Sequence, residues 1–371
     1  MALKINNNQV IIYMNNIELL CNACENNNLE IIKNIINKDK DIIYKCTNDY
    51  NNCFLLACKQ NNLDIIKYII SIDINIINIT SNIHNMNGFI IACIYDSIDV
   101  IKYLLDLKKK LIYSRCLSAM NGFMYACYFD NINTVSLLLN IDNNICYTCN
   151  NDKDNGFVQA CIKGNINIIR LLLTTSNNNL IGNGLLKAAK YGFLSIIKIF
   201  IEYNEKLIDY MSKDLFNVFI VACIYGHLDI VKYLYNIKNS IIYSSNINKN
   251  NGFLFACANS ECIEIVEWFV SIDKTFKFNC NYGLISALIN NNEKIVELLI
   301  LDSDIKKKTC SICLTYDSTI ITDCNHQYCY QCLSSWIKHN NKCKCSCSCI
   351  VKKIECPLCR NNINNILKIK N

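Results

Sequence analysis

The sequence contains very little proline and no long apolar segment. Proline occurs once and tryptophan twice among 371 residues. The longest apolar runs, such as residues 218–225, are far shorter than the stretch of about 18 residues that a membrane span needs. Residues 1–8 lack the apolar core of a signal peptide. We therefore expect a soluble, intracellular protein, cytoplasmic or nuclear, with no membrane partner.

The excess of positive over negative charge is also small. The formal net charge is +6, and basic residues form only short runs, such as residues 108–110 and 306–308. Runs of this kind usually belong to a solvated surface, and no basic helix with base-reading residues accompanies them. We therefore expect no nucleic acid as a partner. The richness in Asn and Ile resembles the coding bias of an AT-rich genome, so Asn-rich loops carry little information on turn chemistry.

A repeated pattern fills the first three hundred residues. It consists of a Gly-containing turn, a short apolar segment with Ala-Cys, a polar turn and a second amphipathic segment. Successive marker alanines are 34, 35, 34, 34, 28, 34, 34 and 31 residues apart. These alanines are Ala23, Ala57, Ala92, Ala126, Ala160, Ala188, Ala222, Ala256 and Ala287. The pattern predicts nine helical hairpins, from about residue 18 to residue 301, that stack into a solenoid to bury their apolar sides.

The units resemble ankyrin repeats, most closely at residues 226–234, Gly-His-Leu-Asp-Ile-Val-Lys-Tyr-Leu. The Thr-Pro-Leu-His of that family is absent and is replaced by variants of Gly-Phe-x-x-Ala-Cys, as in residues 88–93. The tetratricopeptide repeat has a similar period, but its Trp and Tyr landmarks are missing. Divergent ankyrin arrays of large DNA viruses look similar, and a viral origin would place the protein in the host cell cytoplasm. The resemblance implies that the array binds a protein substrate, whose identity has no readable code.

Seven units carry Cys directly after the marker alanine, where a small core residue is expected. These residues are Cys24, Cys58, Cys93, Cys127, Cys161, Cys223 and Cys257. Without a secretion signal, they are interpreted as reduced thiols. For His227 the ankyrin resemblance implies a structural hydrogen bond.

After residue 301 the repeat ends, and the spacing of Cys and His changes. The residues that follow form four ligand pairs: Cys310 and Cys313, Cys324 and His326, Cys329 and Cys332, and Cys356 and Cys359. Two Cys separated by two residues can direct both sulfurs at one ion, and eight ligands predict two closed tetrahedral zinc sites. Zinc of this kind stabilises a small domain and leaves no coordination position for water.

The order of three Cys, one His and four Cys resembles the RING finger family, in which ligand pairs interleave. The resemblance implies one zinc on Cys310, Cys313, Cys329 and Cys332, and a second on Cys324, His326, Cys356 and Cys359. It implies a ubiquitin ligase that binds a ubiquitin-conjugating enzyme through Ile312, Trp336 and Pro357. Arg360 would contact ubiquitin and hold it in a reactive conformation. The mechanism would be positioning, with no covalent intermediate on this chain.

The expected fold is mainly α, an ankyrin solenoid of about nine hairpins followed by a zinc-stabilised α+β RING domain. We expect a capping segment at residues 1–17, repeats at 18–301, a linker at 302–309, the RING at 310–360 and a tail at 361–371. A linker of about eight residues would span at most about 29 Å and limit ubiquitin transfer to nearby lysines. A non-enzymatic scaffold with a zinc-binding interaction domain is the alternative.

One segment departs from the RING pattern. Four cysteines alternate with other residues between the third and fourth ligand pairs: Cys343, Cys345, Cys347 and Cys349. Alternating Cys-x-Cys resembles clusters that bind soft metals. Two interpretations stay open, a low-complexity loop insertion and a site for an additional metal ion.

Overall fold

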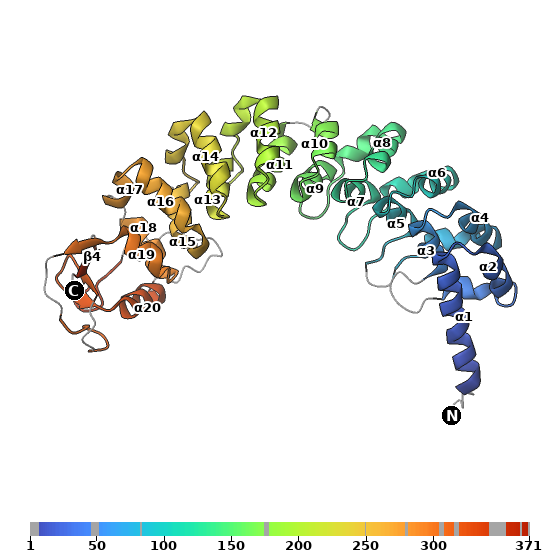
Figure 1. Ribbon diagram of the computed structural model, residues 1–371, viewed down its shortest axis with the longest axis horizontal. Helices are drawn as coiled ribbons and strands as arrows, with labels where there is room; N and C mark the ends of the chain where they lie inside the picture. Colours follow the sequence, from blue (N-terminus) through green and yellow to red (C-terminus); the bar gives the residue numbers. More distant parts are fainter. Residues whose placement is uncertain are drawn as a thin grey trace. The chain divides into compact units, whose positions relative to one another are not determined.

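A computed structural model describes residues 7–45, 52–81, 84–173, 178–248, 250–278, 281–303, 308–314, 319–340, 354–363 and 366–369. The chain divides into two compact units, Met1–Gly184 and Leu185–Asn371. Each is described by itself, and both consist mainly of helices (Figure 1). Within the described ranges, no helix combines the length and the apolar character needed to cross a membrane.

The first unit is built from successive helical hairpins, most of them followed by a short 3-10 helix (Figure 1). Its elements are α1 (Asn7–Glu25), α2 (Leu29–Ile36), η1 (Lys40–Tyr44), α3 (Cys53–Lys59), α4 (Leu63–Ile72), η2 (Ile74–Asn78), α5 (Gly88–Ile94), α6 (Ile98–Leu107), η3 (Lys109–Tyr113), α7 (Gly122–Tyr128), α8 (Ile132–Ile141), η4 (Asn143–Tyr147), α9 (Gly156–Lys163) and α10 (Ile166–Leu173). Helix α11 (Asn178–Lys190) contains the division between the units.

The second unit continues the hairpins and then changes to a small sheet. Its hairpin elements are α12 (Leu194–Tyr203), η5 (Glu205–Asp209), α13 (Val218–Ile224), α14 (Leu228–Ile237), η6 (Asn239–Tyr243), α15 (Gly252–Ala258), η7 (Ser260–Cys262), α16 (Ile263–Ile272), α17 (Thr275–Phe278), α18 (Asn281–Ile289) and α19 (Glu293–Leu299). Four strands and α20 (Tyr330–Asn340) follow.

The marker alanines lie at the centre of this architecture. All nine are buried, and each lies in the first helix of a hairpin. The seven cysteines that follow them are fully buried as well. Burial raises the pKa of five of these thiols well above its usual value, those of Cys58, Cys93, Cys127, Cys161 and Cys223. They are therefore inert core residues, as the sequence predicts.

Glycine and cysteine interlock where neighbouring hairpins of one unit stack. A Cβ built on Gly122 would lie 2.6 Å from the Cys93 sulfur and 2.9 Å from Cε1 of Phe89 in the preceding hairpin. At Gly252, the Cys223 sulfur would lie at 2.7 Å. The Gly-Phe-x-x-Ala-Cys pattern therefore has a packing cause: each glycine leaves room for the Phe and Cys of the hairpin before it.

Asparagine has a structural role that the sequence interpretation missed. The Asn155 side-chain oxygen accepts from the backbone N–H of Val158 at 3.0 Å, which caps the start of α9, while its Nδ2 donates to the Cys146 carbonyl at 3.0 Å. Asparagine caps the first helix of five other hairpins in the same way, at Asn52, Asn87, Asn121, Asn217 and Asn251. The expectation that Asn carries little information on local structure is therefore wrong at these positions, because capping satisfies N–H groups that the helix leaves open.

The expected hydrogen bond of His227 is present. Its Nε2 lies 3.0 Å from the Lys190 carbonyl oxygen, so the imidazole links the turn before α14 to the end of α11. In the first unit, Asn131 and Asn165 occupy the matching position and donate to carbonyls of the preceding hairpin. His227 is thus one member of a structural series.

The described strands form one sheet of four, in the order β1-β4-β2-β3. Strand β1 (Leu301–Ser303) pairs parallel to β4 (Ile366–Ile369), while β2 (Ile320–Thr322) pairs antiparallel to both β4 and β3 (Gln327–Tyr328). The predicted linker and tail therefore each supply a strand.

Helix α20 packs against α18 of the last hairpin (Figure 1). The fully buried Ser334 hydroxyl donates to the Leu288 carbonyl at 2.6 Å. This contact and the β1–β4 pairing hold the cysteine-rich domain, residues 308–363, against the last hairpin. The distance that this domain can move from the repeats is therefore not determined by the length of a free linker.

Candidate metal centre

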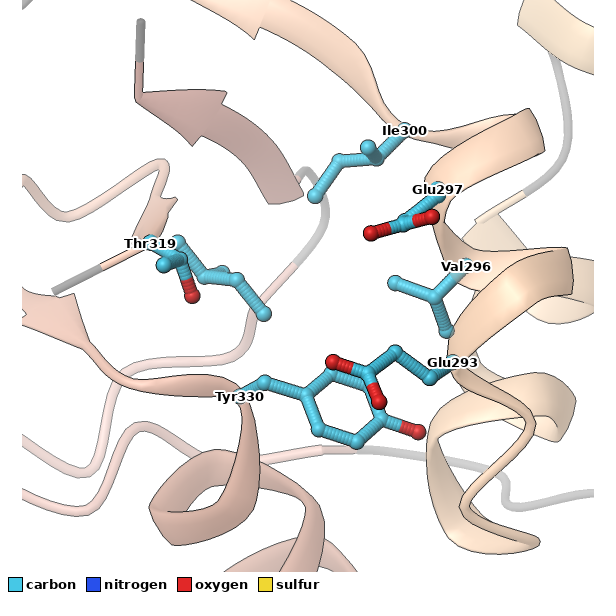
Figure 2. A pocket seen from close by; sticks show the side chains of 7 residues that line it. Glu293, Val296, Glu297, Ile300, Thr319 and Tyr330 are labelled. Atoms are coloured by element: carbon cyan, nitrogen blue, oxygen red, sulfur yellow. The ribbon is translucent and has the colours of Figure 1, made fainter. Parts of the chain in front are cut away.

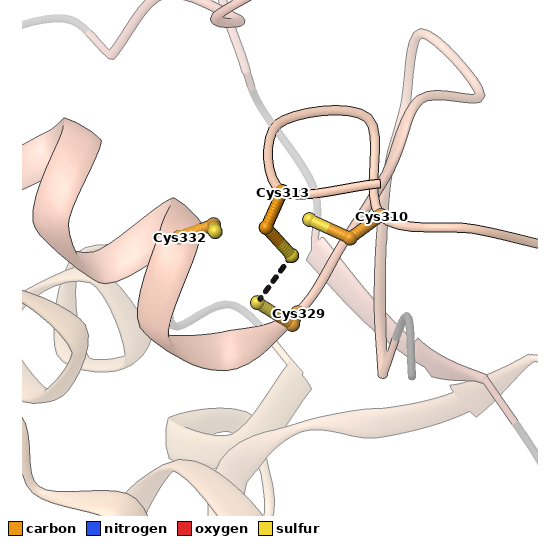
Figure 3. A group of neighbouring side chains, drawn as sticks. All are labelled: Cys310, Cys313, Cys329 and Cys332. Carbon is orange, nitrogen blue, oxygen red and sulfur yellow. Dashed lines mark hydrogen bonds between the residues drawn. The ribbon is translucent and has the colours of Figure 1, made fainter. Parts of the chain in front are cut away.

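The first cluster of ligands contains Cys310, Cys313, Cys329 and Cys332. Figure 3 shows the four sulfurs turned toward one another, two from a loop, one from the residue just before α20 and one from the first turn of α20. All four lie within 4.8 Å of one another, and the Cys313 and Cys329 sulfurs are 3.8 Å apart. Two sulfurs at 2.3 Å from a tetrahedral ion are separated by about 3.8 Å. The spacing therefore fits a single bound ion.

The second cluster contains Cys324, His326, Cys356 and Cys359, whose ligand atoms also lie within 4.8 Å of one another. His326 Nδ1 is 3.3 Å from the Cys324 sulfur and 3.4 Å from the Cys356 sulfur. Tetrahedral coordination by sulfur and nitrogen separates such atoms by about 3.5 Å. The structure thus brings together the same two groups of four that the RING resemblance implies, with the pairs interleaved along the chain.

Two matching turns aim the sulfurs of the Cys-x-x-Cys pairs. The Leu314 N–H donates to the Cys310 carbonyl at 2.9 Å, and the Arg360 N–H donates to the Cys356 carbonyl at 3.0 Å. Leu314 and Arg360 both have left-handed backbone angles, with φ of 62° and 60°. In each turn the chain makes one helical turn that ends at the left-handed residue. Both thiols of the pair then lie on the same side of the turn.

Thiolates in the two clusters would need a cation to neutralise their charge. Burial raises the pKa of Cys356, but hydrogen bonds from the Cys359 backbone and the Tyr328 hydroxyl outweigh it and lower that pKa to about 6. Burial, followed by hydrogen bonds with the Cys329 and Cys313 side chains, raises the pKa of Cys332. Several thiolates cannot share so small a space unless a positive ion neutralises them. Each cluster can therefore hold a metal ion.

Tyr328 supports the second cluster from behind. Its side chain is fully buried, and its hydroxyl lies 3.0 Å from the Cys356 sulfur. The Thr322 hydroxyl lies 3.1 Å from the Cys324 sulfur. Groups that hydrogen-bond to metal ligands fix their orientation. The sequence interpretation missed both residues, because neither has a spacing that marks it.

The residues expected to bind a conjugating enzyme lie beside the clusters. Ile312 is 43% exposed, Pro357 is half-buried, and Trp336 on α20 is half-buried with its Nε1 donating to the Glu355 carbonyl at 3.1 Å. The guanidinium carbon of the exposed Arg360 lies 5.1 Å from the centre of the Trp336 ring. Trp336 and Arg360 are therefore brought together, which their separation in the sequence does not reveal.

Two further apolar side chains are exposed in the same turns, Leu314 at 73% and Leu358 at 53%. Sequence reasoning did not select them, although each lies next to a ligand. By contrast, Cys343, Cys345, Cys347 and Cys349 lie outside the described residues, so an additional metal site there stays a prediction.

Comparison with known proteins supports the first part of the chain most directly. Residues 20–116 match a family model of ankyrin repeats in three copies, and residues 219–270 match a model of ankyrin repeats in many copies. The chain carries ankyrin repeats. Neither matched segment reaches the cysteine-rich domain.

Two curated proteins are similar to parts of the chain. The putative ankyrin repeat protein L72 of Acanthamoeba polyphaga mimivirus is 26% identical over 144 residues, which are 32% of this chain and 35% of that protein. The RING finger protein PSH1 of Saccharomyces cerevisiae is 37% identical over 68 residues, which are 18% of this chain and 14% of that protein. The chain thus spans about a third or less of the length of either relative.

Proposed function

We propose that the protein is a RING-type ubiquitin ligase whose ankyrin repeats recruit a protein substrate. In this proposal the cysteine-rich domain is a RING with two zinc ions, and it binds a ubiquitin-conjugating enzyme. The observation that carries it is the interleaving of two four-ligand clusters, Cys310 with Cys329 and Cys324 with Cys356, along one short domain. The partial similarity to a protein named as a RING finger protein agrees with it.

The donor sets favour zinc over other metals. Four thiolates, or three thiolates and one imidazole, in tetrahedral arrangement suit zinc, whereas magnesium and calcium prefer oxygen ligands. Bound zinc would supply structural stability alone, because four protein ligands fill its coordination sphere. Reactivity must therefore come from a partner that the domain positions.

The exposed apolar side chains supply a surface for that partner. Ile312 and Leu358 project from the two ligand turns, and Trp336 lies on α20 beside the second turn. Apolar side chains held on rigid turns lose little conformational entropy on binding. This surface would hold the conjugating enzyme, as the RING resemblance implies.

Arg360 would act on the ubiquitin carried by that enzyme. Its guanidinium stacks over Trp336 and is exposed, so it can reach a carbonyl of a bound partner. In the transfer, the amine of a substrate lysine attacks the thioester carbonyl, an isopeptide bond forms and the thiol of the conjugating enzyme leaves. Rate would come from restricting a flexible donor to the geometry of attack.

The test is discharge of ubiquitin from a panel of charged conjugating enzymes onto free lysine, with the full chain present. We expect faster discharge with at least one enzyme, and loss of about tenfold or more in rate with Ile312→Ala, since apolar anchors dominate such interfaces. Leu117→Ala is the matched control, because Leu117 is an exposed apolar residue of the repeats. Zinc content is measured for each variant. No acceleration across the panel by a zinc-loaded chain would contradict the proposal.

A second candidate function is a non-enzymatic scaffold in which the metal domain caps the array. The buried contact of Ser334 with the Leu288 carbonyl favours it, because this contact covers the last hairpin. Terminal repeats need such a cover. The two candidates separate in the same assay: a scaffold leaves discharge unchanged, while losing the metal destabilises the last hairpin.

A further inference from the structure

A small pocket lies between the last hairpin and the metal domain. It has a volume of about 100 Å³. In Figure 2, side chains from α19 on one side face Thr319 and Tyr330 on the other. Neither family match covers it, and none of the eight metal ligands lines it. It is therefore separate from the site described above.

Apolar side chains form part of the pocket wall. Val296 lies on α19, Ile300 directly follows the end of that helix, and Ile320 comes from β2. All three are buried residues. They can cover the alkyl part of a ligand, and they belong to elements that the sheet and the α18–α20 contact hold in place.

Two hydroxyl oxygens in this pocket have no hydrogen-bond partner among the described residues. They are Oγ1 of Thr319 and the phenolic oxygen of Tyr330, and both atoms are buried from solvent. A buried hydroxyl without a hydrogen-bond partner lowers the stability of the folded protein. A ligand that reaches these atoms with N–H groups would recover this stability.

The charge in the pocket has one sign. Glu293 and Glu297 lie one helical turn apart on α19 and line the pocket, and no Lys, Arg or His is among the described lining residues. The two hydroxyl acceptors and the two carboxylates, together with the apolar wall, complement a ligand that carries a cation at the end of an alkyl chain.

We propose that this pocket binds a lysine side chain of a partner protein. The four-carbon stem would lie along Val296, Ile300 and Ile320, and the ammonium would lie between the two carboxylates and donate to the Thr319 hydroxyl. Lysine carries such a stem and three N–H donors in a compact head. The inference goes beyond the proposed function and does not require ubiquitin transfer, because it concerns binding alone.

The test uses the full chain with labelled isoleucine methyl groups and n-butylammonium as the probe. Nuclear magnetic resonance follows the methyls of Ile300 and Ile320, assigned from Ile300→Val and Ile320→Val. We expect saturable shifts with butylammonium and an affinity weaker by about fivefold or more for Glu293→Gln/Glu297→Gln, the loss expected for two partly exposed ion pairs. The neutral isostere n-butanol should bind more weakly.

Controls separate local binding from general charge effects. Glu264→Gln/Glu267→Gln removes the same charge from exposed positions on α16, the second helix of the preceding hairpin, and should leave the affinity unchanged. Thr319→Val should weaken binding, because it removes one acceptor. The proposal is overturned by shifts without saturation, by equal binding of butanol, or by an affinity that the Glu293/Glu297 variant does not alter. Tighter binding of n-propylguanidinium would assign the pocket to arginine and overturn the choice of lysine.

Discussion

Gly252→Ala tests the packing of glycine against the preceding hairpin, and its effect follows from the space around a Cβ placed at this position. The added Cβ would lie 2.7 Å from the Cys223 sulfur, and 3.2 Å from both Cβ of Cys223 and Cε1 of Phe219. Overpacking by one methyl costs about 1 to 3 kcal/mol. Without this overpacking, Gly252→Ala would stabilise the folded protein by about 0.4 to 1 kcal/mol, because alanine lowers the conformational entropy of the unfolded chain. We therefore expect a net loss of about 1 to 2 kcal/mol in the free energy of unfolding.

Removing the sulfur should rescue the variant, since only the contacts at 3.2 Å then remain. Cys223→Ala alone should cost about 1 kcal/mol, as for loss of a buried methyl. The double variant should be more stable than the sum of the single changes by at least about 1 kcal/mol. As control, Gly252→Ala/Cys127→Ala should be additive, because Cys127 faces Gly156 in a different hairpin.

The assay is urea unfolding followed by the fluorescence of Trp268, which lies on α16 in the same hairpin as Gly252. The chain has two tryptophans, so Trp336→Phe makes Trp268 the only indole reporter. Local unfolding near α15 then dominates the signal. A stabilising Gly252→Ala, or coupling with Cys223 below about 0.5 kcal/mol, would refute the packing argument.

Three further outcomes follow from the contacts described above. Asn155→Ala should lower the free energy of unfolding by about 1 to 3 kcal/mol, because a helix cap and a buried hydrogen bond are lost, whereas exposed Asn151→Ala should have little effect in the same denaturation assay. Ser334→Ala should lower hydrogen-exchange protection in α18, while Ser335→Ala at the exposed neighbouring position should not. A strong zinc chelator should change the fluorescence of Trp336 and leave most helical circular dichroism intact; full retention of the Trp336 signal would speak against metal-dependent folding.

The repeat and the ligand groups could be predicted because local patterns determine them. Marker alanines such as Ala92 lie where helices must approach closely, so their period along the chain reports the hairpins directly. The grouping of Cys310 with Cys329 came from a resemblance, since spacing alone also permits sequential filling of the two sites. The structure places these sulfurs in one cluster.

Contacts between elements could not be predicted in this way. The role of Asn155 could not be predicted, because the carbonyl of Cys146 to which it donates belongs to a different turn. Likewise, Ser334 is one of many serines until α20 is placed against α18. Strands β1 and β4 are more than 60 residues apart in the sequence, and strands this short carry no pattern that predicts which strand they pair with.

The most direct test of the central claim counts the zinc ions on each variant by native mass spectrometry of tag-free protein. We predict two ions for the unaltered chain, one for Cys313→Ser/Cys329→Ser, which damages a single site, and none for Cys313→Ser/Cys324→Ser, which damages both. Sequential sites would give the reverse, none for the first variant and one for the second. That reversal, or an unaltered chain that holds no zinc, would contradict the interleaved metal centre on which the proposed ligase depends.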